Sequence, residues 1–523
     1  MRGRIFFFLQ VILLLAASAQ AQQPVRFQIS VAPEVADKAV SGRLLVFMTQ
    51  SAADGKLLAP DLMNPSRVWV EAVEVHDLEP GTPIEVAPTL SFPKPFAQAS
   101  VGDYRFMALL DVNHNYSYKT RADGGDLHSD VIEQHGFDPA KPAAVALTLS
   151  KRVAGQEFKD TVSQKLVSME SRVLSKFWGR PITVEAVVLL PPSYSKEPSR
   201  RYPAVYEIHG YQGNYLDSAH YRGREIAAAM SSGKTPEMIY VFLNGECPLG
   251  HHEFADSVNN GPWGEALTRE FIPYLEKKFR MDGVPRGRLL TGHSSGGWSS
   301  LWLEINYPDV FGGTWSTSPD PEDFRSFTDI DLLKGDNFYY DAGGKERNLF
   351  RFHGKEIMSM KEFVQLEQVL GDYGGQMQSF DAVFSPRGED GRPMQVFDHQ
   401  TGKVNPEVVK AWEERYDVST YLRKNWKQIG PKLKGKIRVW VGSVDNFHLE
   451  GSARLLEQTL KELDAGAKVT YLEGRDHFDL YRGGLAEEIA KEMYAVVRAK
   501  QSPAVSRQSP APAANRVGGA DTR

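Results

Sequence analysis

Cysteine is almost absent from this sequence, which has a single one, Cys247, among 523 residues. One thiol excludes an intramolecular disulfide, so packing and hydrogen bonds have to hold the fold together in any compartment. Cys247 lies in the segment NGECPLG, which contains no motif of a catalytic or metal-binding cysteine. We interpret this residue as incidental to function.

A strong excess of charge is also missing. Lys and Arg number 61 against 66 Asp and Glu, the formal net charge is −5, and no long basic run occurs, so nucleic-acid binding is not expected. Beyond the N-terminus no apolar run is long enough for a membrane span, and no internal repeat is visible. The chain is too long for one hydrophobic core, which predicts two or more domains.

The two ends of the sequence differ in composition from the rest. Arg2 and Arg4 precede the apolar residues 5–17, and Ala19-Gln20-Ala21 fits a signal-peptidase site. We therefore predict a signal peptide over residues 1–21 and an exported chain, periplasmic or extracellular; an uncleaved membrane anchor is the alternative. Residues 501–523, rich in Pro, Ala and Ser, are predicted to be disordered.

Residues 22–160 are predicted to form an all-β, sandwich-like domain. Short apolar or alternating runs separated by turn residues occur at 43–50, 68–75, 104–112 and 144–150. Within them the segment DVNHN resembles the start of a calcium loop. Its sixth position, Tyr116, is where such a loop needs glycine, and no Glu stands at the twelfth position, so we interpret it as a turn.

Residues 161–500 are predicted to form a catalytic domain of the α/β class. Residues 168–194 indicate two strands joined through the turn WGRP, and later apolar strands alternate with helical patterns. The later strands are expected at 204–208, 237–243, 288–291, 313–318, 436–442 and 468–473. This alternation favours a mostly parallel sheet covered on both faces. It is interrupted over residues 319–434, an insertion of the kind that forms lids or substrate walls.

Four serines cluster in RLLTGHSSGGWSS, residues 288–300. A nucleophile elbow needs glycine two positions before and two positions after the reactive serine, because the backbone is crowded there. Only Ser294 meets this requirement, with Gly292 and Gly296 on its two sides; for Ser295 the earlier position would be His293. A strand precedes and a helix follows, so we predict Ser294 as the nucleophile.

A serine nucleophile needs a base and an acid that orients the base, and in this fold class they follow it in the order acid, then histidine. Asp445 follows the strand at 436–442, and His477 follows the strand at 468–473. We predict these two residues as the acid and the base. The weaker rivals are His448, Glu473, Asp476 and Asp479.

Two backbone N–H groups are needed to bind the oxyanion. We predict that Ser295 supplies one and that Tyr211, in the loop EIHGYQGN, supplies the other, with Gly210 as the alternative. His251 and His252 are adjacent, a poor spacing for a shared metal, so no metal site is predicted. Trp263, Trp298 and the loop 248–254 either line a pocket or pack in the core.

Residues 165–497 resemble the putative-esterase family of α/β-hydrolases, which includes esterase D, feruloyl esterases, enterochelin esterases and mycolyltransferases. The matching segments, in the family's order, are GRPITVEAVVLLPPSY, RYPAVYEIHGYQGN, GHSSGGWSS, YPDVFGGTWSTSPD, VGSVDNFHLEGSARLL and GRDHFDLY. The resemblance implies ester hydrolysis or acyl transfer without a cofactor. It places Ser294, Asp445 and His477 on the triad positions, and Tyr211 and Ser295 on the oxyanion-hole positions. The long insertion and the N-terminal domain depart from the family's pattern.

The sequence therefore predicts an exported serine esterase that acts on a small-molecule or carbohydrate-linked ester. One alternative is an acyltransferase to a sugar or lipid acceptor, which shares the same acyl-enzyme. The other is a secreted binding protein on a hydrolase scaffold, although such a protein would not need all three triad candidates. The sequence indicates neither the acyl group nor an oligomeric state.

Overall fold

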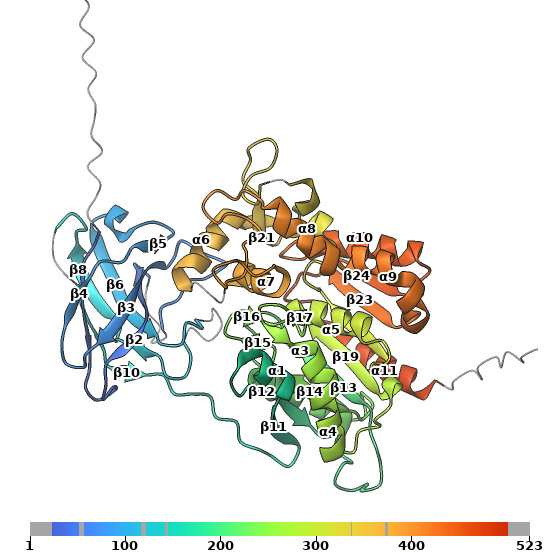
Figure 1. The fold of residues 1–523 in the computed structure, drawn as a ribbon. Helices are drawn as coiled ribbons and strands as arrows, with labels where there is room; N and C mark the ends of the chain where they lie inside the picture. Colours follow the sequence, from blue (N-terminus) through green and yellow to red (C-terminus); the bar gives the residue numbers. More distant parts are fainter. Residues whose placement is uncertain are drawn as a thin grey trace, which may run out of the picture.

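The structure is a computed structural model that describes residues 24–51, 57–116, 122–141, 145–335, 337–371 and 375–499. The predicted signal peptide, residues 1–21, and the predicted disordered tail, residues 501–523, lie outside them. In these ranges no helix combines the length and the apolar character needed to cross a membrane. Figure 1 shows a strand-rich N-terminal unit beside a larger unit in which helices surround a sheet.

The N-terminal unit contains two sheets. The smaller has the strand order β4-β1-β9, and the larger has the order β10-β7-β6-β2-β3-β5, with β8 also paired to β6. The strands are β1 (Phe27–Val31), β2 (Val40–Thr49), β3 (Trp69–Leu78), β4 (Ile84–Val86), β5 (Leu90–Phe92), β6 (Gly102–Asp111), β7 (Leu127–His128), β8 (Ile132–Phe137), β9 (Val145–Leu149) and β10 (Lys151–Arg152), with the 3₁₀ turn η1 (Phe96–Gln98). The apolar runs predicted as strands lie in β2, β3, β6 and β9. In the DVNHN segment, the Asp111 carboxylate accepts the N–H groups of Asn113, Asn115 and Tyr116.

Strand β2 is buried on both faces, which explains its continuous apolar run. Leu44 and Val46 belong to the core of the N-terminal unit, whereas Leu45 and Phe47 point the other way into a second core. That second core is shared with the insertion of the larger unit, whose helix α6 (Met360–Leu370) packs against β3 and β5. A strand covered on both sides loses the alternation of polar and apolar residues that marks a half-exposed strand.

Arg43 of β2 joins the two units. Its side chain is 4% exposed, and its guanidinium donates to the carbonyls of Val369 and Gln368 at 2.9 and 2.5 Å. It also donates to Glu74 at 2.6 Å. The last carbonyls of a helix have no partner within the helix, and a cation favours that end, so Arg43 caps α6.

We expect Arg43→Ala to destabilise the chain by about 2 kcal/mol, because two helix-terminal carbonyls lose a buried charged donor. The measurement is the midpoint of the first thermal unfolding transition. Arg26→Ala is the matched control: Arg26 pairs with Glu85 on the surface of the same unit, and exposed ion pairs contribute about 0–1 kcal/mol. Equal shifts for both variants would contradict the capping role.

The larger unit is built on an eight-stranded sheet in the order β11-β12-β14-β13-β19-β20-β23-β24. Its strands are β11 (Gln164–Glu170), β12 (Thr183–Leu189), β13 (Ala204–Ile208), β14 (Ile239–Leu243), β19 (Arg288–His293), β20 (Gly313–Thr317), β23 (Ile437–Gly442) and β24 (Lys468–Leu472). The six strands from β14 to β24 are parallel, and β12 runs antiparallel to both neighbours. The fold class predicted from the sequence, an α/β-hydrolase fold with an N-terminal β-sandwich-like domain, is confirmed.

Helices cover both faces of this sheet. One face packs against α2 (Tyr215–Ser231) and α11 (Leu485–Arg498). The other face is covered by α1 (Arg172–Trp178), α3 (Trp263–Glu265), the π-helical turn η2 (Ala266–Phe271), α4 (Ile272–Lys278), α5 (Ser295–Asn306), α9 (Val418–Leu433) and α10 (Leu449–Glu462). Parallel strands buried on both faces need the continuous apolar sequences seen in β13 and β14.

The connection between the first two strands differs from the prediction. Between β11 and β12 the chain forms the short helix α1 rather than a turn through WGRP. The Ser171 hydroxyl oxygen accepts the Leu174 N–H at 3.3 Å, and Gly179 ends the helix with a φ of 66°. Ser at the N-cap and Gly after the last turn are typical helix boundaries, so these two residues of the sequence indicate a helix here.

The predicted insertion, residues 319–434, contains its own elements. They are η4 (Phe324–Ser326), η5 (Leu332–Lys334), the hairpin β21 (Asn348–Phe352) and β22 (Lys355–Ser359), α6, α7 (Gln376–Phe384), α8 (Pro406–Arg415) and α9. Helix α9 packs against α5 and α10 as a crossover helix between β20 and β23. The preceding elements gather over the carboxyl ends of the strands (Figure 1). The remaining short elements are β15 (Glu246–Cys247), β16 (Gly250–His251), β17 (Asp256–Ser257), β18 (Gly261–Pro262) and η3 (Pro285–Gly287).

Candidate active site

Ser294 stands at a sharp turn between β19 and α5. The strand ends at His293, the helix begins at Ser295, and Ser294 has φ 59° and ψ −126°. A residue with a side chain adopts positive φ only at a cost in free energy, so the surrounding contacts must hold it there. The Ser294 N–H donates to the carbonyl of Thr317 on β20, at 3.1 Å.

The two flanking glycines are required by contacts with backbone atoms. A Cβ at Gly292 would lie 2.1 Å from the carbonyl oxygen of Gly296, and a Cβ at Gly296 would lie 2.0 Å from the carbonyl oxygen of Ile208. Both distances are shorter than any contact a methyl group tolerates. The steric reason for choosing Ser294 from the sequence therefore applies in the structure: the turn at this serine closes only when both flanking residues lack a side chain.

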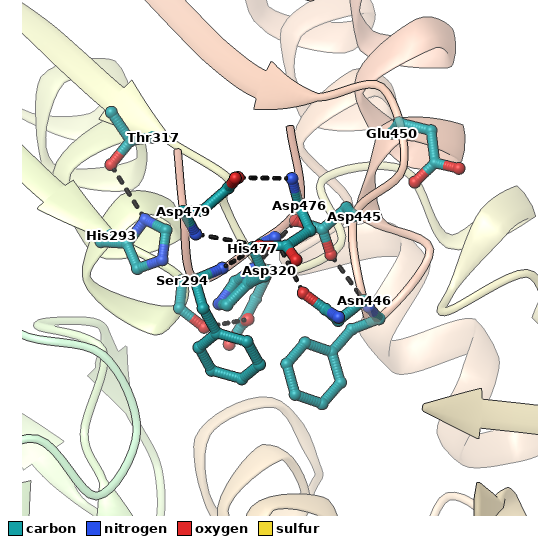
Figure 2. A network of polar contacts seen from close by, with 12 residues as sticks. His293, Ser294, Thr317, Asp320, Asp445, Asn446, Glu450, Asp476, His477 and Asp479 are labelled. Atoms are coloured by element: carbon teal, nitrogen blue, oxygen red, sulfur yellow. Dashed lines mark hydrogen bonds and ion pairs between the residues drawn. The ribbon is translucent and has the colours of Figure 1, made fainter. Parts of the chain in front are cut away.

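Asp445 and His477 come together from the loops after β23 and β24 (Figure 2). The His477 Nδ1 lies 2.9 Å from the Asp445 Oδ2, and the Asp445 side chain is fully buried. The N–H of Phe447 donates to the other Asp445 oxygen at 2.9 Å. The His477 N–H donates to the Asn446 side-chain oxygen at 2.9 Å, so each loop fixes the other.

The rival acids and histidine have other contacts. The Asp476 carboxylate accepts the N–H groups of Phe478 and Asp479, and the Asp479 carboxylate accepts the N–H of Asp476. Both acids therefore stabilise the turn at residues 476–479. Glu473 is exposed, and His448 occupies the N-cap position of α10. Of the candidate acids, Asp445 is the one hydrogen-bonded to the His477 ring.

The charges of Asp445 and His477 stabilise each other. Burial alone would raise the pKa of Asp445, but the charge and hydrogen bond of His477 outweigh it and lower this pKa. Burial alone would lower the pKa of His477, but the Asp445 carboxylate, and then the charge of Asp320, raise it above its ordinary value. The neighbouring His293, whose ring centroid lies 4.4 Å from that of His477, has its pKa lowered to about 3 by burial and by the His477 charge.

The Ser294 hydroxyl forms a hydrogen bond with Asp320, an acid that the sequence did not identify as a site residue. Its Oγ donates to the Asp320 Oδ1 at 3.3 Å, and the contacts of the described residues include no hydrogen bond between Ser294 and His477. The Ser295 hydroxyl donates to the other Asp320 oxygen at 2.5 Å. Figure 2 shows Asp320 grouped with Ser294 and His477. Burial, followed by the charge of Glu253, raises the pKa of Asp320 to about 7.

The predicted oxyanion-hole loop lies directly against Ser294. A Cβ at Gly210 would be 3.0 Å from the Ser294 Cβ and 3.7 Å from its Oγ. The Gly210 carbonyl lies 2.8 Å from the His209 Nδ1 and accepts the N–H of Gly213 at 2.8 Å. In a trans peptide the carbonyl and the next N–H point in opposite directions, so these bonds orient the Tyr211 N–H. Ser295 is the first residue of α5, where an N–H has no acceptor within the helix.

Residues of the insertion lie close to the half-buried Ser294. A cavity of about 20 Å³ beside it, little more than one water molecule, is enclosed by residues from the insertion and from the loop after β23. Its lining includes Asp320, Thr328, Leu349, Met377, Phe380 and Phe447. This cavity alone is too small for more than a water-sized molecule.

The two tryptophans and the histidine pair belong to the packing around the site. Trp298 is fully buried between Trp302 and Phe384, and Trp263 stacks on His252 with ring centroids 3.9 Å apart. Burial lowers the pKa of His251 to about 4. Within the ranges that the structure describes, no three His, Cys, Asp or Glu side chains are grouped as a metal site.

The family model described as "Putative esterase" matches residues 175–327. The matched segment runs through β12 to β20 and includes Tyr211, Ser294 and Ser295, whereas Asp445 and His477 lie beyond it. Over this segment the larger unit is similar to the putative-esterase family, the resemblance that the sequence motifs predict.

Parts of the chain are similar to known proteins. The uncharacterized protein YbbA of Bacillus subtilis (strain 168) is 28% identical over 142 residues, which are 25% of this chain and 54% of the relative. The chain spans about half the length of the curated relatives it matches. A solved ferulic acid esterase aligns with 64% of this chain and 99% of its own at 16% identity and a TM-score of 0.40. An S-formylglutathione hydrolase from Agrobacterium tumefaciens aligns with 64% and 95% at 14% identity and a TM-score of 0.39.

Proposed function

We propose that the protein is a serine carboxylic-ester hydrolase in which Ser294 is the nucleophile, His477 the base and Asp445 the acid that orients the base. The observation that carries the proposal is the 2.9 Å hydrogen bond between His477 and Asp445. It lies at the carboxyl ends of the parallel strands, where Ser294 also lies. The family match over residues 175–327 supports the ester chemistry.

In the acylation step, the Ser294 Oγ forms a bond to the carbonyl carbon of the ester while the His477 Nε2 takes the hydroxyl proton. Asp445 bonds the Nδ1, which keeps the proton on that atom and leaves the Nε2 free to act as the base. Asp445 also stabilises the imidazolium that forms. Before this step, the Ser294 hydroxyl turns from Asp320 towards His477.

The carbonyl oxygen becomes an oxyanion, which the N–H groups of Ser295 and Tyr211 bind, together with the positive end of the α5 dipole. His477 then gives its proton to the leaving alcohol, and the C–O bond to that alcohol breaks. In the second half of the reaction, water gives a proton to His477, attacks the acyl-enzyme and releases the carboxylic acid and Ser294.

The insertion is proposed to act as a lid over this site. Its α7 residues Met377 and Phe380 close the cavity beside Ser294, and a closed site excludes water from the reaction. We also propose export through the signal peptide, because a basic start, an apolar run and Ala19-Gln20-Ala21 are present at the N-terminus. The expected mature chain starts at Gln22, which N-terminal sequencing of exported protein checks.

The proposed function is tested with the purified wild-type chain and a panel of p-nitrophenyl acyl esters, acetylated sugars and feruloyl esters. We expect turnover of at least one of the short acyl esters, unchanged by EDTA and abolished by a fluorophosphonate. A folded chain that hydrolyses none of these esters, or that loses its activity with EDTA, would contradict the proposal.

A further inference from the structure

Asp320 is attached to the nucleophile elbow by three hydrogen bonds. Its carboxylate accepts the hydroxyl of Ser294 at 3.3 Å and the hydroxyl of Ser295 at 2.5 Å, and its own N–H donates to the Ser294 carbonyl at 3.3 Å. It follows β20, the strand beside the one that carries Ser294, and its side chain is 3% exposed. An acid held this closely to a proposed nucleophile affects any charge that forms beside it.

Titratable groups face Asp320 from three directions. His477 approaches from the loop after β24, and its charge favours the ionised form of Asp320. In the segment 251–253, burial raises the pKa of Glu253 to about 8 and lowers the pKa of His251 to about 4, so both side chains are mostly neutral at pH 7. Glu322, in Asp320's own segment, is a further buried acid whose pKa the charge of Asp320 raises. With its pKa at about 7, the Asp320 carboxyl is mostly ionised above neutral pH.

We propose that Asp320 is a positioning residue of the esterase site, whose carboxylate holds the two elbow hydroxyls and, with Asp445, stabilises the positively charged His477. The inference rests on the proposed function and adds a second acid to it. Asp445 bonds the Nδ1 side of the ring, whereas Asp320 lies on the side of Ser294, where the proton arrives. Two carboxylates near one imidazolium, in a site with little water, stabilise it more than one does.

The sign of the pH effect follows from this arrangement. The ionised Asp320 raises the pKa of His477. His477 acts as a base only when it is neutral, so the rate falls as the pH drops through its pKa. Asp320→Asn keeps the shape and removes the charge, so the pKa of His477 falls. The acidic limb of the kcat/KM profile then moves to lower pH, by roughly one unit for a close charge.

The rate at high pH is expected to fall at the same time. A less stabilised imidazolium makes His477 a weaker base, and with ordinary Brønsted behaviour the plateau drops by roughly three- to tenfold. A purely structural defect would lower the plateau without moving the acidic limb. The combination of a lower plateau and a limb at lower pH is therefore the signature of the charge of Asp320.

The experiment measures kcat/KM of the wild type, Asp320→Asn and Asp323→Asn from pH 5 to 9, and the NMR titration of His477 in each chain. Asp323→Asn is the matched control, a buried acid three residues on whose carboxylate pairs with Arg325. We expect a lower apparent pKa for His477 in Asp320→Asn and no shift in Asp323→Asn. Ser295→Ala provides a second variant: it removes a bond that favours the ionised Asp320, so a smaller shift in the same direction is expected.

The outcomes separate the two levels of the proposal. A wild type that hydrolyses esters, with His477 titrating at the same pH in wild type and Asp320→Asn, overturns the role of Asp320 and leaves the esterase intact. A wild type without ester turnover overturns the proposed function, and the NMR titration still decides whether Asp320 stabilises the charged His477. An equal shift in Asp323→Asn overturns the inference as well.

Discussion

Ser294→Ala is expected to lower kcat for short p-nitrophenyl esters by a factor of roughly 10⁵, because the chain then lacks the oxygen proposed to form the acyl-enzyme. The fold is expected to survive, since alanine differs from serine by one oxygen atom and the glycines that permit the turn remain. The measurement is the steady-state rate, with circular dichroism as the check on folding.

Ser300→Ala is the matched control for this variant. Ser300 belongs to the same serine cluster and the same helix, but its hydroxyl bonds the Gly297 carbonyl and Thr314 instead of facing Asp320. We expect Ser300→Ala to retain activity within a few-fold of the wild type. If Ser300→Ala abolished the activity while Ser294→Ala retained it, the choice of nucleophile would be wrong.

His477→Ala is expected to lower kcat/KM by a factor of roughly 10⁴ to 10⁶, because a neutral serine hydroxyl is a weak nucleophile without a base. The variant also leaves the buried Asp445 carboxylate without its cation, and an uncompensated buried charge destabilises a fold. We therefore expect a lower midpoint of thermal unfolding together with the lost activity, and both are measured on the same preparation.

His220→Ala is the control for the removal of a histidine. His220 is exposed on α2, on the face of the sheet opposite to the insertion, and contacts the ring of Tyr221. Its loss is expected to leave kcat/KM and the thermal midpoint nearly unchanged. Activity of His477→Ala comparable to that of His220→Ala would remove His477 from the mechanism.

The sheet of the larger unit was predictable because its strands are short, apolar and regularly separated by helical patterns. The strands predicted at 204–208 and 468–473 match β13 and β24 to within one residue. Helix α1 was missed because its seven residues make only two turns, too short a segment for a helical period to stand out. Its signal is confined to the two boundary residues, Ser171 and Gly179.

The candidate site was predictable where steric or topological rules restrict the choice. Contacts of 2.1 and 2.0 Å at Gly292 and Gly296 explain why one register of the serine cluster fits an elbow. Asp445 and His477 follow adjacent parallel strands, whose carboxyl ends meet at one edge of the sheet. The order of the strands therefore identifies the two loops that come together, and Asp445 and His477 are the side chains that meet there.

Asp320 and the residues that line the cavity beside Ser294 were not predictable in the same way. Asp320 follows β20 in the segment STSPD and lies between Ser294 and His477 in the chain, so the order serine, acid, histidine does not separate it from Asp445. The cavity combines side chains from positions as distant as Thr328, Met377 and Phe447. Contacts across such separations depend on how α7 and the β21–β22 hairpin pack, which no local pattern encodes.

The measurement that tests the central claim most directly is the position of a covalent fluorophosphonate adduct on the wild-type chain. Trypsin is expected to release residues 289–325 as one peptide that contains Ser294 together with Ser295, Ser299 and Ser300. Fragmentation of this peptide in the mass spectrometer assigns the modified residue. We predict one adduct per chain, on Ser294; an adduct on another serine, or a folded chain that remains unlabelled, would contradict the assignment.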